Sequence, residues 1–485
     1  MFFRVTSTNK LMRSIMAVVI LVITALTPGI SIAESEQSFD NTYFDQNANG
    51  LDDRMEGLIL EGKSVGVILV LEKKPNQKHF DVIDRLGLTV DHVYKYINAI
   101  RIDEVPASKT YELTQIPELK LVEWQAPVYP FLDTSVSAIK VRDSSDYSPV
   151  VWDKQFYGEG INIAILDTGV DNEHETFGEY EDQEVRRFIA GIDCDGGCPT
   201  ENGEYKFTTE EDSNEDPDDF NGHGTHTAST SLGTGGDDDE DGDGEPDYIG
   251  VAPAARLIDV KVMADWGSGS SADINEAIEA CIENVNTDWE NDGEKNNGVH
   301  VMSMSLGTSG GSDGSDTQSQ LVNQANAAGI VVAIAMGNDG ENEVPSPAAA
   351  DWSVAVGAMD NEENINRDND DLGSYSNYGP RDDDGDSDRW DELKPSVVAP
   401  GSDITAALGH SNIPGFTSSA SGWTSQTGTS MACPHVAGLA ALILEADISL
   451  RPDSNSNAVR DRLQEYSEFC PAGRVLRVLY FIASV

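Results

Sequence analysis

From about residue 160 onward, short apolar segments alternate with amphipathic segments of helical length, and this alternation limits the fold more than any other sequence feature. The strand-like segments are Ile161–Leu166, Val251–Val262, Val299–Leu306, Gly329–Met336 and Trp352–Met359. Helical periodicity lies between them at Ala272–Val285 and Thr317–Ala328. Strands that alternate with helices at this spacing form a parallel sheet with helices on both faces. We therefore predict a doubly wound, mostly parallel α/β fold for residues 151–485.

A smaller unit precedes this domain. Its strand-like and helical segments are Gly66–Leu71, Phe80–Leu88, Val93–Ile102 and Leu119–Trp124. Because β-branched runs surround one helical stretch, we predict a small α+β domain at residues 65–132. An acidic segment, residues 34–64, comes before it. Residues 133–150, rich in Ser and Asp, are predicted to form an exposed linker.

The N-terminus has the pattern of a secretory signal peptide at residues 1–33. Basic residues precede an apolar run, Ile15–Leu26, and small residues lead to a cleavage site after Ala33. The run is short for a membrane span, although an uncleaved signal anchor is the alternative. We expect an exported protein with no membrane contact after cleavage.

The chain carries 85 acidic and 31 basic residues, for a net charge of −54. This charge excludes nucleic-acid binding through a basic surface and disfavours binding to anionic membranes. Hydrophobic residues make up 39% of the chain, enough for a packed core, so we place the acidic residues on surfaces and loops. Clustered carboxylates keep a protein soluble at high salt and also bind calcium, and both explanations stay open.

Five cysteines are too few for a disulfide scaffold in an exported chain of this size. Cys194 and Cys198 flank an Asp-Gly-Gly turn, where a small disulfide-closed loop is predicted. The other three, Cys281, Cys433 and Cys470, have no evident partner in the sequence and are expected to be buried thiols.

Three segments with small flanking residues carry reactive side chains in the order Asp, His, Ser. Asp167 ends an apolar strand, His223 opens Gly-His-Gly-Thr-His, and Ser430 lies in Gly-Thr-Ser-Met-Ala before an apolar helix. Serine needs a neighbouring base to act as a nucleophile, and that base needs an orienting carboxylate. Taken singly, the segments also fit an aspartic-protease signature, a metal-binding histidine pair and a common turn. Together, in this order, they favour a hydrolytic triad.

With these motifs, residues Val151 to Leu463 resemble the subtilisin-like serine proteases, or subtilases. The resemblance implies that Asp167 orients the base His223 and that Ser430 is the nucleophile. A further match, Met-Gly-Asn-Asp-Gly, implies that Asn338 stabilises the oxyanion together with the Ser430 backbone N–H.

The resemblance also implies a peptide-binding cleft between two backbone segments, which would pair with an extended protein or peptide substrate. The residues of these segments are Gly267, Ser268, Gly269, Ser305, Leu306 and Gly307. By position, the small α+β unit resembles the propeptide that inhibits such enzymes intramolecularly, and a retained substrate-recruiting domain is the alternative. We expect a monomer.

Two loops have oxygen ligands at alternate positions followed by a glycine turn, as calcium requires. The first contains Asp45, Asn47, Asn49 and Asp53, and the second contains Asp239, Asp241, Asp243 and Asp247. The first also fits the EF-hand formula through Glu56. A third run, Asp382 to Asp386, lacks the glycine, so a calcium loop and a solvated charge run are equally supported there.

The chain departs from the subtilase pattern after Glu468, where the expected Gly-rich strand is replaced by an apolar tail. A divergent final strand and an aberrant end both fit. Two other functions also remain open: an inactive subtilase-fold binding module and an esterase that uses the same triad.

Overall fold

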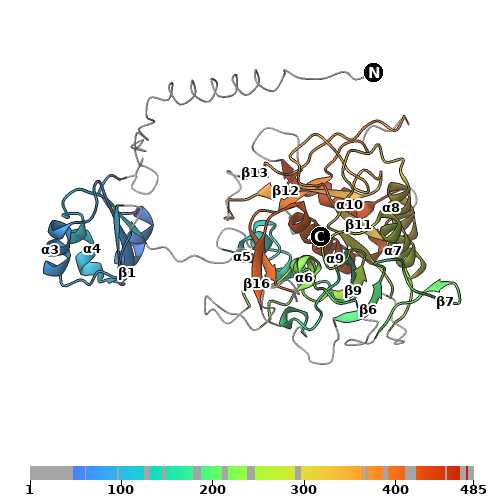
Figure 1. Cartoon of the computed structure of the whole chain (residues 1–485), viewed down its shortest axis with the longest axis horizontal. Coiled ribbons are helices and arrows are strands. Elements are labelled where there is room, and N and C mark those ends of the chain that lie inside the picture. The colour runs from blue at the N-terminus through green and yellow to red at the C-terminus, as the bar shows by residue number, and fades with distance from the viewer. Residues whose placement is uncertain are drawn as a thin grey trace, which may run out of the picture. The chain divides into compact units, whose positions relative to one another are not determined.

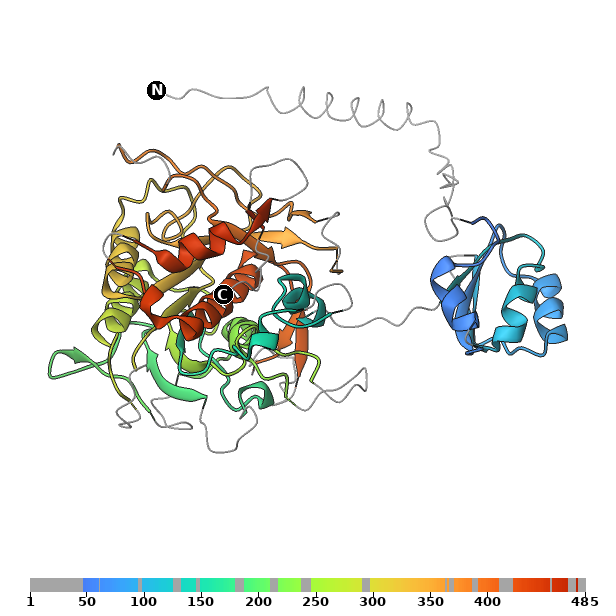
Figure 2. The same ribbon diagram turned by 180° about the vertical axis from the view of Figure 1, so that it is seen from behind.

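The computed structural model contains two compact units, Met1–Val128 and Tyr129–Val485, which are described separately (Figures 1 and 2). It describes residues 47–60, 62–94, 98–124, 132–144, 149–178, 187–209, 217–236, 246–289, 297–362, 364–365, 370–385, 391–409, 422–453, 456–469 and 477–478. The predicted signal peptide therefore lies outside the described residues.

The smaller unit is a four-stranded sheet in the order β2-β3-β1-β4, with antiparallel neighbours. Its elements are β1 (Val65–Leu71), α3 (Gln77–Arg85), β2 (His92–Val93), β3 (Ala99–Val105), α4 (Ala107–Leu113) and β4 (Leu119–Trp124). Alternate residues of β1 are buried because one face of the sheet packs against the core of the unit. The predicted small α+β domain is confirmed.

The acidic segment that precedes this domain is partly integrated into it. Residues Asp53–Met55 (η2) and Glu56–Leu60 (α2) are helical, and Leu51, Met55 and Ile59 are buried in the same core as β1. Leu51 also forms a bridge with Val122. The expected boundary at residue 65 is therefore too late for the structural unit.

The larger unit is built on a ten-stranded sheet in the order β17-β18-β14-β12-β11-β10-β5-β9-β6, with β13 beside β12. The strands from β14 to β6 in this order are parallel. Their bounds are β5 (Asn162–Asp167), β6 (Phe188–Asp193), β9 (Arg256–Lys261), β10 (Val301–Met304), β11 (Val331–Ala335), β12 (Val354–Asp360) and β14 (Val397–Pro400). The remaining strands are β7 (Thr200–Glu201), β8 (Glu204–Tyr205), β13 (Asp371–Leu372), β15 (Ile404–Ala407), β16 (Trp423–Gln426), β17 (Glu468–Phe469) and β18 (Arg477–Val478).

Helices cover both faces of this sheet, as predicted. They are α6 (His223–Leu232), α7 (Ser271–Glu283), α8 (Thr317–Ala328), α9 (Thr429–Ala446) and α10 (Ala458–Glu465), with short 3₁₀ turns at Trp152–Lys154, Glu175–Phe177 and Ile448–Leu450. Ile163 and Ile165 of β5 pack into the core with α6 and α9, whereas Ala164 and Leu166 pack into the core with α7 and α8. Figure 1 shows α7 and α8 side by side.

The region expected to be an exposed linker, residues 133–150, is partly buried in the larger unit. It contains α5 (Leu132–Ala138), and Val136, Ile139 and Val141 belong to the core that includes α9. Ser135 also contacts His435 of α9 through a 2.9 Å hydrogen bond. The prediction of an exposed linker is wrong for residues 135–141, because their apolar side chains fill the core.

The cysteine predictions are confirmed where the structure describes them. Cys194 and Cys198 form a disulfide, and Cys281 and Cys433 are buried thiols. Burial raises the pKa of both thiols to about 12, so they remain protonated and inert. Cys470 lies outside the described residues.

The order of the strands creates one crevice at the edge of the sheet. After β5 the chain builds β6 and β9 on one side of it, and then β10, β11 and β12 on the other. The carboxyl ends of parallel strands meet at one edge, and ligands bind where the strand order reverses. The residues that follow β5, β10 and β11 are therefore brought together.

Candidate active site

Asp167 is the last residue of β5 and is 1% exposed. Its Oδ1 accepts hydrogen bonds from the Thr168 backbone N–H, at 2.8 Å, and from Nδ1 of His223, at 2.7 Å. Its Oδ2 accepts a 3.2 Å hydrogen bond from the Thr227 hydroxyl. These donors fix the carboxylate, which in turn fixes the orientation and tautomer of the imidazole.

His223 is the first residue of α6, and two glycines allow its position. Gly222 has a φ of +94°, a left-handed conformation that favours glycine. A Cβ at Gly224 would lie 2.0 Å from the Gly169 carbonyl oxygen, so only glycine lets α6 approach the end of β5 this closely. The structure therefore brings Asp167 and His223 together.

The surroundings of His223 favour its charged form. Burial alone would lower its pKa, but the charge of Asp167, their hydrogen bond and the charge of Asp219 outweigh burial and raise the pKa above the ordinary 6.5. The side chain remains 25% exposed. A ring that is both accessible and stabilised as a cation is suited to accept a proton and return it.

Ser430 lies in the first turn of α9, and this helix packs against α6, which begins at His223. The Ser231 hydroxyl of α6 donates a 2.9 Å hydrogen bond to the Pro434 carbonyl of α9. The Ser430 hydroxyl donates to the Ser305 carbonyl, at 3.3 Å, rather than to His223. Ser430 and His223 both line the same cleft.

Asn338 follows β11 and lines the cleft beside Ser430. Its Oδ1 accepts hydrogen bonds from the Thr429 backbone N–H, at 2.8 Å, and from the Thr429 hydroxyl, at 3.0 Å. Among the described residues, nothing accepts a hydrogen bond from Asn338 Nδ2 or from the Ser430 backbone N–H. These two residues of the cleft lining thus each have an N–H group without an acceptor in the described part of the chain.

The cleft has a volume of about 450 Å³ and is lined from both sides by backbone segments. Of the predicted substrate-binding residues, Gly267, Ser305, Leu306 and Gly307 line it. Ser268 and Gly269 are exposed and lie outside its lining, and residues 267–269 form no described strand.

Asp219 is a residue of the site that the sequence did not reveal. It is fully buried, and its carboxylate accepts five hydrogen bonds. The donors are the backbone N–H groups of Asn221, Gly222 and Thr225 and the hydroxyls of Thr168 and Thr225. Burial raises its pKa, and the hydrogen bonds oppose that shift. The carboxylate fixes the turn that leads into His223.

The predicted calcium loops are only partly described. In the first, Asn47 Nδ2 donates a 2.6 Å hydrogen bond to Asp53 Oδ1, and the Asn49 backbone N–H donates to Asn47 Oδ1 at 3.1 Å. Asp45 lies outside the described residues. In the second loop only Asp247 is described, and it is buried, whereas Asp239, Asp241 and Asp243 are not described.

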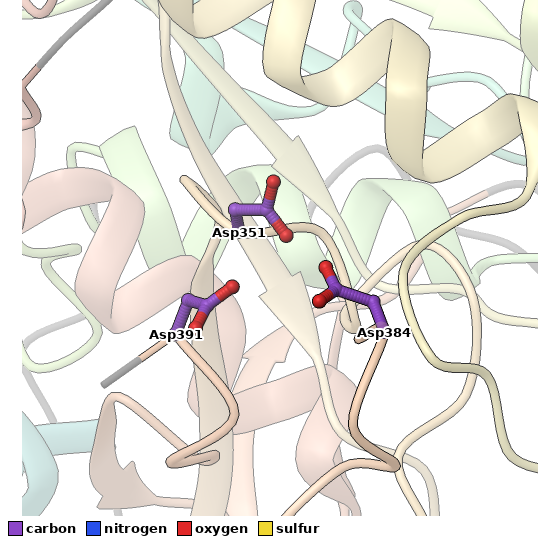
Figure 3. Close-up of side chains that lie close together, drawn as sticks. All are labelled: Asp351, Asp384 and Asp391. Carbon is purple, nitrogen blue, oxygen red and sulfur yellow. The ribbon is translucent and has the colours of Figure 1, made fainter. Parts of the chain in front are cut away.

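A group of three carboxylates has the geometry of a metal site, but it already surrounds a cation. Oxygens of Asp351, Asp384 and Asp391 lie within 4.8 Å of one another and point toward a common centre (Figure 3). The fully buried Arg381 pairs with all three, at 2.9 Å from Asp351 and 3.1 Å from Asp384. Asp384 belongs to the third acidic run, where the structure favours an ion-pair network.

Comparisons with known proteins identify the family of this chain. A model of the subtilase family matches residues 158–467. Serine protease AprX of Bacillus subtilis (strain 168) is 29% identical over 388 residues, 78% of this chain and 77% of that protein. Alkaline elastase YaB of Bacillus sp. (strain YaB) is 30% identical over 358 residues, which are 74% of this chain and 72% of that protein. The solved structure of sphericase is 29% identical, covers 69% of this chain and 89% of that one, and has a TM-score of 0.49. The chain belongs to the subtilase family of subtilisin-like serine peptidases.

Proposed function

We propose that this protein is a secreted serine endopeptidase that cleaves peptide bonds through Asp167, His223 and Ser430. The observation that carries the proposal is the 2.7 Å contact between the buried Asp167 and His223, which lines a cleft together with Ser430 and Asn338. A base held by a buried carboxylate, next to a serine at a helix N-terminus, is the arrangement that acyl transfer requires.

The reaction follows from these positions. His223 Nε2 removes the proton of the Ser430 hydroxyl as its oxygen attacks the carbonyl carbon of the substrate. Asn338 Nδ2 and the Ser430 backbone N–H donate to the oxyanion that forms. Collapse breaks the peptide bond as His223 gives the proton to the leaving amine, and an acyl-enzyme remains. Water, deprotonated by His223, then releases the acid and regenerates Ser430.

The test compares Ser430→Ala and His223→Ala with wild type on a fluorogenic peptide amide and on the matching ester. Ser425, exposed on β16, provides the control variant Ser425→Ala. Each triad variant should lose at least about 10⁴-fold in kcat/KM on the amide, and the control should retain wild-type activity. Hydrolysis of the ester alone by wild type would favour the esterase alternative, and no hydrolysis of either would favour the inactive binding module.

We also propose that the enzyme is made as a precursor with a signal peptide at residues 1–33 and an inhibitory propeptide in the smaller unit. Support comes from the signal pattern and from the separate core of that unit. N-terminal sequencing of protein from the culture medium tests this. Wild type should begin beyond the smaller unit, whereas Ser430→Ala should keep it. Wild type that retains the unit would favour a substrate-recruiting domain.

Calcium is the cofactor that we propose, held in the loops at Asp45–Asp53 and Asp239–Asp247. The donor set in each loop is carboxylate and amide oxygen, which a hard cation prefers. In the first loop the Asn47 Nδ2 group donates a 2.6 Å hydrogen bond to Asp53 Oδ1, so these two predicted ligand residues lie side by side. Bound calcium would crosslink each loop and stabilise the folded state.

A further inference from the structure

The cleft beyond Ser430 is formed by two chain segments, Leu306–Gly310 after β10 and Gly337–Pro345 after β11. Backbone hydrogen bonds hold them together, from Thr308 N–H to the Ser346 carbonyl and from Ser312 N–H to the Val344 carbonyl, both at 2.8 Å. Asn338 belongs to one of these segments. If its Nδ2 holds the carbonyl oxygen of the substrate bond that is attacked, the side chain of the substrate residue that carries this carbonyl lies in this part of the cleft.

Apart from His223 of the triad, the ionisable side chains that line the cleft are two carboxylates in this region, Asp339 and Glu343. No lysine or arginine is among the described residues that line the cleft. The Glu343 side chain lies along the opposite segment, because a Cβ at Gly310 or Gly311 would be 3.6 Å from its Oε1. The Glu343 side chain therefore reaches from one segment toward the other, and Glu343 is part of the cleft lining.

Neither carboxylate is neutralised by the protein. Within the described part of the chain, Asp339 and Glu343 form no ion pair, and their side chains accept no hydrogen bond. Acidic residues are abundant on this surface, so their presence alone would mean little. These two differ because they stand in the wall of a half-enclosed cavity beside the nucleophile.

We propose that this part of the cleft selects substrates with a cationic side chain, lysine or arginine, on the residue whose carbonyl is attacked. The inference rests on the proposed function and names its substrate class. A lysine or arginine head group would pair with Glu343, and with Asp339 at the mouth, while its aliphatic stem contacts Leu306 and Pro345. The net charge of −54 also attracts cationic peptides over longer range.

The experiment measures kcat/KM for peptides that differ only in this residue: lysine, arginine, acetyl-lysine, norleucine and glutamate. Norleucine has a similar stem without the charge. Wild type should prefer lysine or arginine over norleucine by about tenfold or more, the factor that 1.4 kcal/mol of charge-assisted hydrogen bonding provides. Lysine cleaved no faster than norleucine would overturn the proposal.

Variants show whether these two side chains are responsible. The double variant Glu343→Gln with Asp339→Asn should lower the lysine-to-norleucine ratio about tenfold. Glu341, exposed two residues away and outside the lining, supplies the control Glu341→Gln, whose ratio should stay at the wild-type value. An unchanged ratio in the double variant would overturn the assignment.

If the double variant does not fold, the salt dependence of the wild-type ratio takes its place. The ratio should fall between 0.05 and 0.5 M sodium chloride, because salt screens the charge pair, and a constant ratio would contradict the proposal. Labelling of Ser430 by a fluorophosphonate, measured in the same samples, keeps the two claims apart. Its failure would refute the proposed function, whereas normal labelling with no cationic preference would refute only this inference.

Discussion

The hydroxyl of Thr168 donates a 2.9 Å hydrogen bond to Asp219 and accepts another of 2.9 Å from the Gly224 backbone N–H. Thr168 follows Asp167 in the chain, and Gly224 follows His223. This one hydroxyl therefore connects the end of β5, the start of α6 and the loop between them. These contacts connect the residue after the orienting carboxylate to the residue after the base, and Asp219 accepts the hydrogen bond of the hydroxyl that links them.

Asp219→Asn should lower kcat by about tenfold to a hundredfold. The carboxylate accepts five hydrogen bonds, and the amide of asparagine would place N–H groups against some of these donors. The turn that leads into His223 would then shift, and the base would be displaced. The charge of Asp219 helps to raise the pKa of His223, so its loss should move the acidic limb of the pH profile of kcat/KM to lower pH. KM should change little, because Asp219 does not line the cleft.

The control for this variant is Asp218→Asn, an exposed neighbour. The groups that donate to Asp219 belong to Thr168, Asn221, Gly222 and Thr225, and the charge of Asp219 also acts on His223. A purely structural role would lower the melting temperature and leave the acidic limb in place, and that result would contradict a positioning role.

Three of the buried histidines should make the protein sensitive to mild acid. Burial lowers the pKa of His435 to about 4 and those of His226 and His300 to about 3, against an ordinary 6.5 in the unfolded chain. Their folded pKa lies below the unfolded one, so the stability that they contribute is complete above pH 6.5 and is lost as the pH falls. Each should contribute a slope of about 1.4 kcal/mol per pH unit below 6.5.

Urea unfolding between pH 6.5 and 5, at saturating calcium, measures this slope. In that window most carboxylates remain ionised, so the histidines dominate. His435→Gln should reduce the slope by about 1.4 kcal/mol per pH unit, because burial keeps the His435 ring neutral in the folded protein, although its hydrogen bond to the Met431 carbonyl opposes this pKa shift. A slope equal to that of wild type would show that His435 charges freely in the folded state.

Arg381→Met should destabilise the larger unit by about 3–5 kcal/mol, because it leaves three carboxylates facing one another without their cation. The measurement is the midpoint of chemical unfolding of Ser430→Ala protein, which cannot digest itself. Adding Asp351→Asn and Asp391→Asn to this variant should restore part of the loss. If the two asparagine substitutions lower the stability of the Arg381→Met variant further, Arg381 does not stabilise the protein by compensating the charge of these carboxylates.

Calcium removal should lower the melting temperature by about 5 °C or more and speed autolysis, because a ligand that binds only the folded state stabilises it by mass action. Asp241→Ala, within the alternate-acid pattern, should show a smaller response to calcium than wild type. Asp237→Ala, in the same acidic run but outside that pattern, is the matched control. Superimposable melting curves in EGTA and in calcium would mean that neither loop binds the ion.

The fold was largely predictable, because the apolar segments that became β5, β10 and β11 are short, continuous and separated by helical periodicity. The candidate triad was found because each member lies in an unusual run of small residues. One of these small residues is Gly224, and it has a physical reason to be glycine, because a side chain there would collide with the chain just after β5.

Burial of polar side chains was not predictable. Asp219 lies at the end of an acidic run, which is the pattern of a solvated loop, yet five donors compensate its burial. Residues 135–141 were misassigned as a linker because Ser and Asp neighbours mask Val136 and Ile139, which fill the core one helical turn apart. Such outcomes depend on partners distant in sequence, and composition does not carry that information.

The central claim is that Ser430 is an activated nucleophile, and labelling by a fluorophosphonate tests it most directly. Wild type should gain one adduct, located by mass spectrometry on the peptide that contains Ser430, and the rate should fall as His223 is protonated at acidic pH. His223→Ala should label at least about 10³-fold more slowly, because the serine loses its base. An adduct on another residue, or equal labelling of wild type and His223→Ala, would contradict the account.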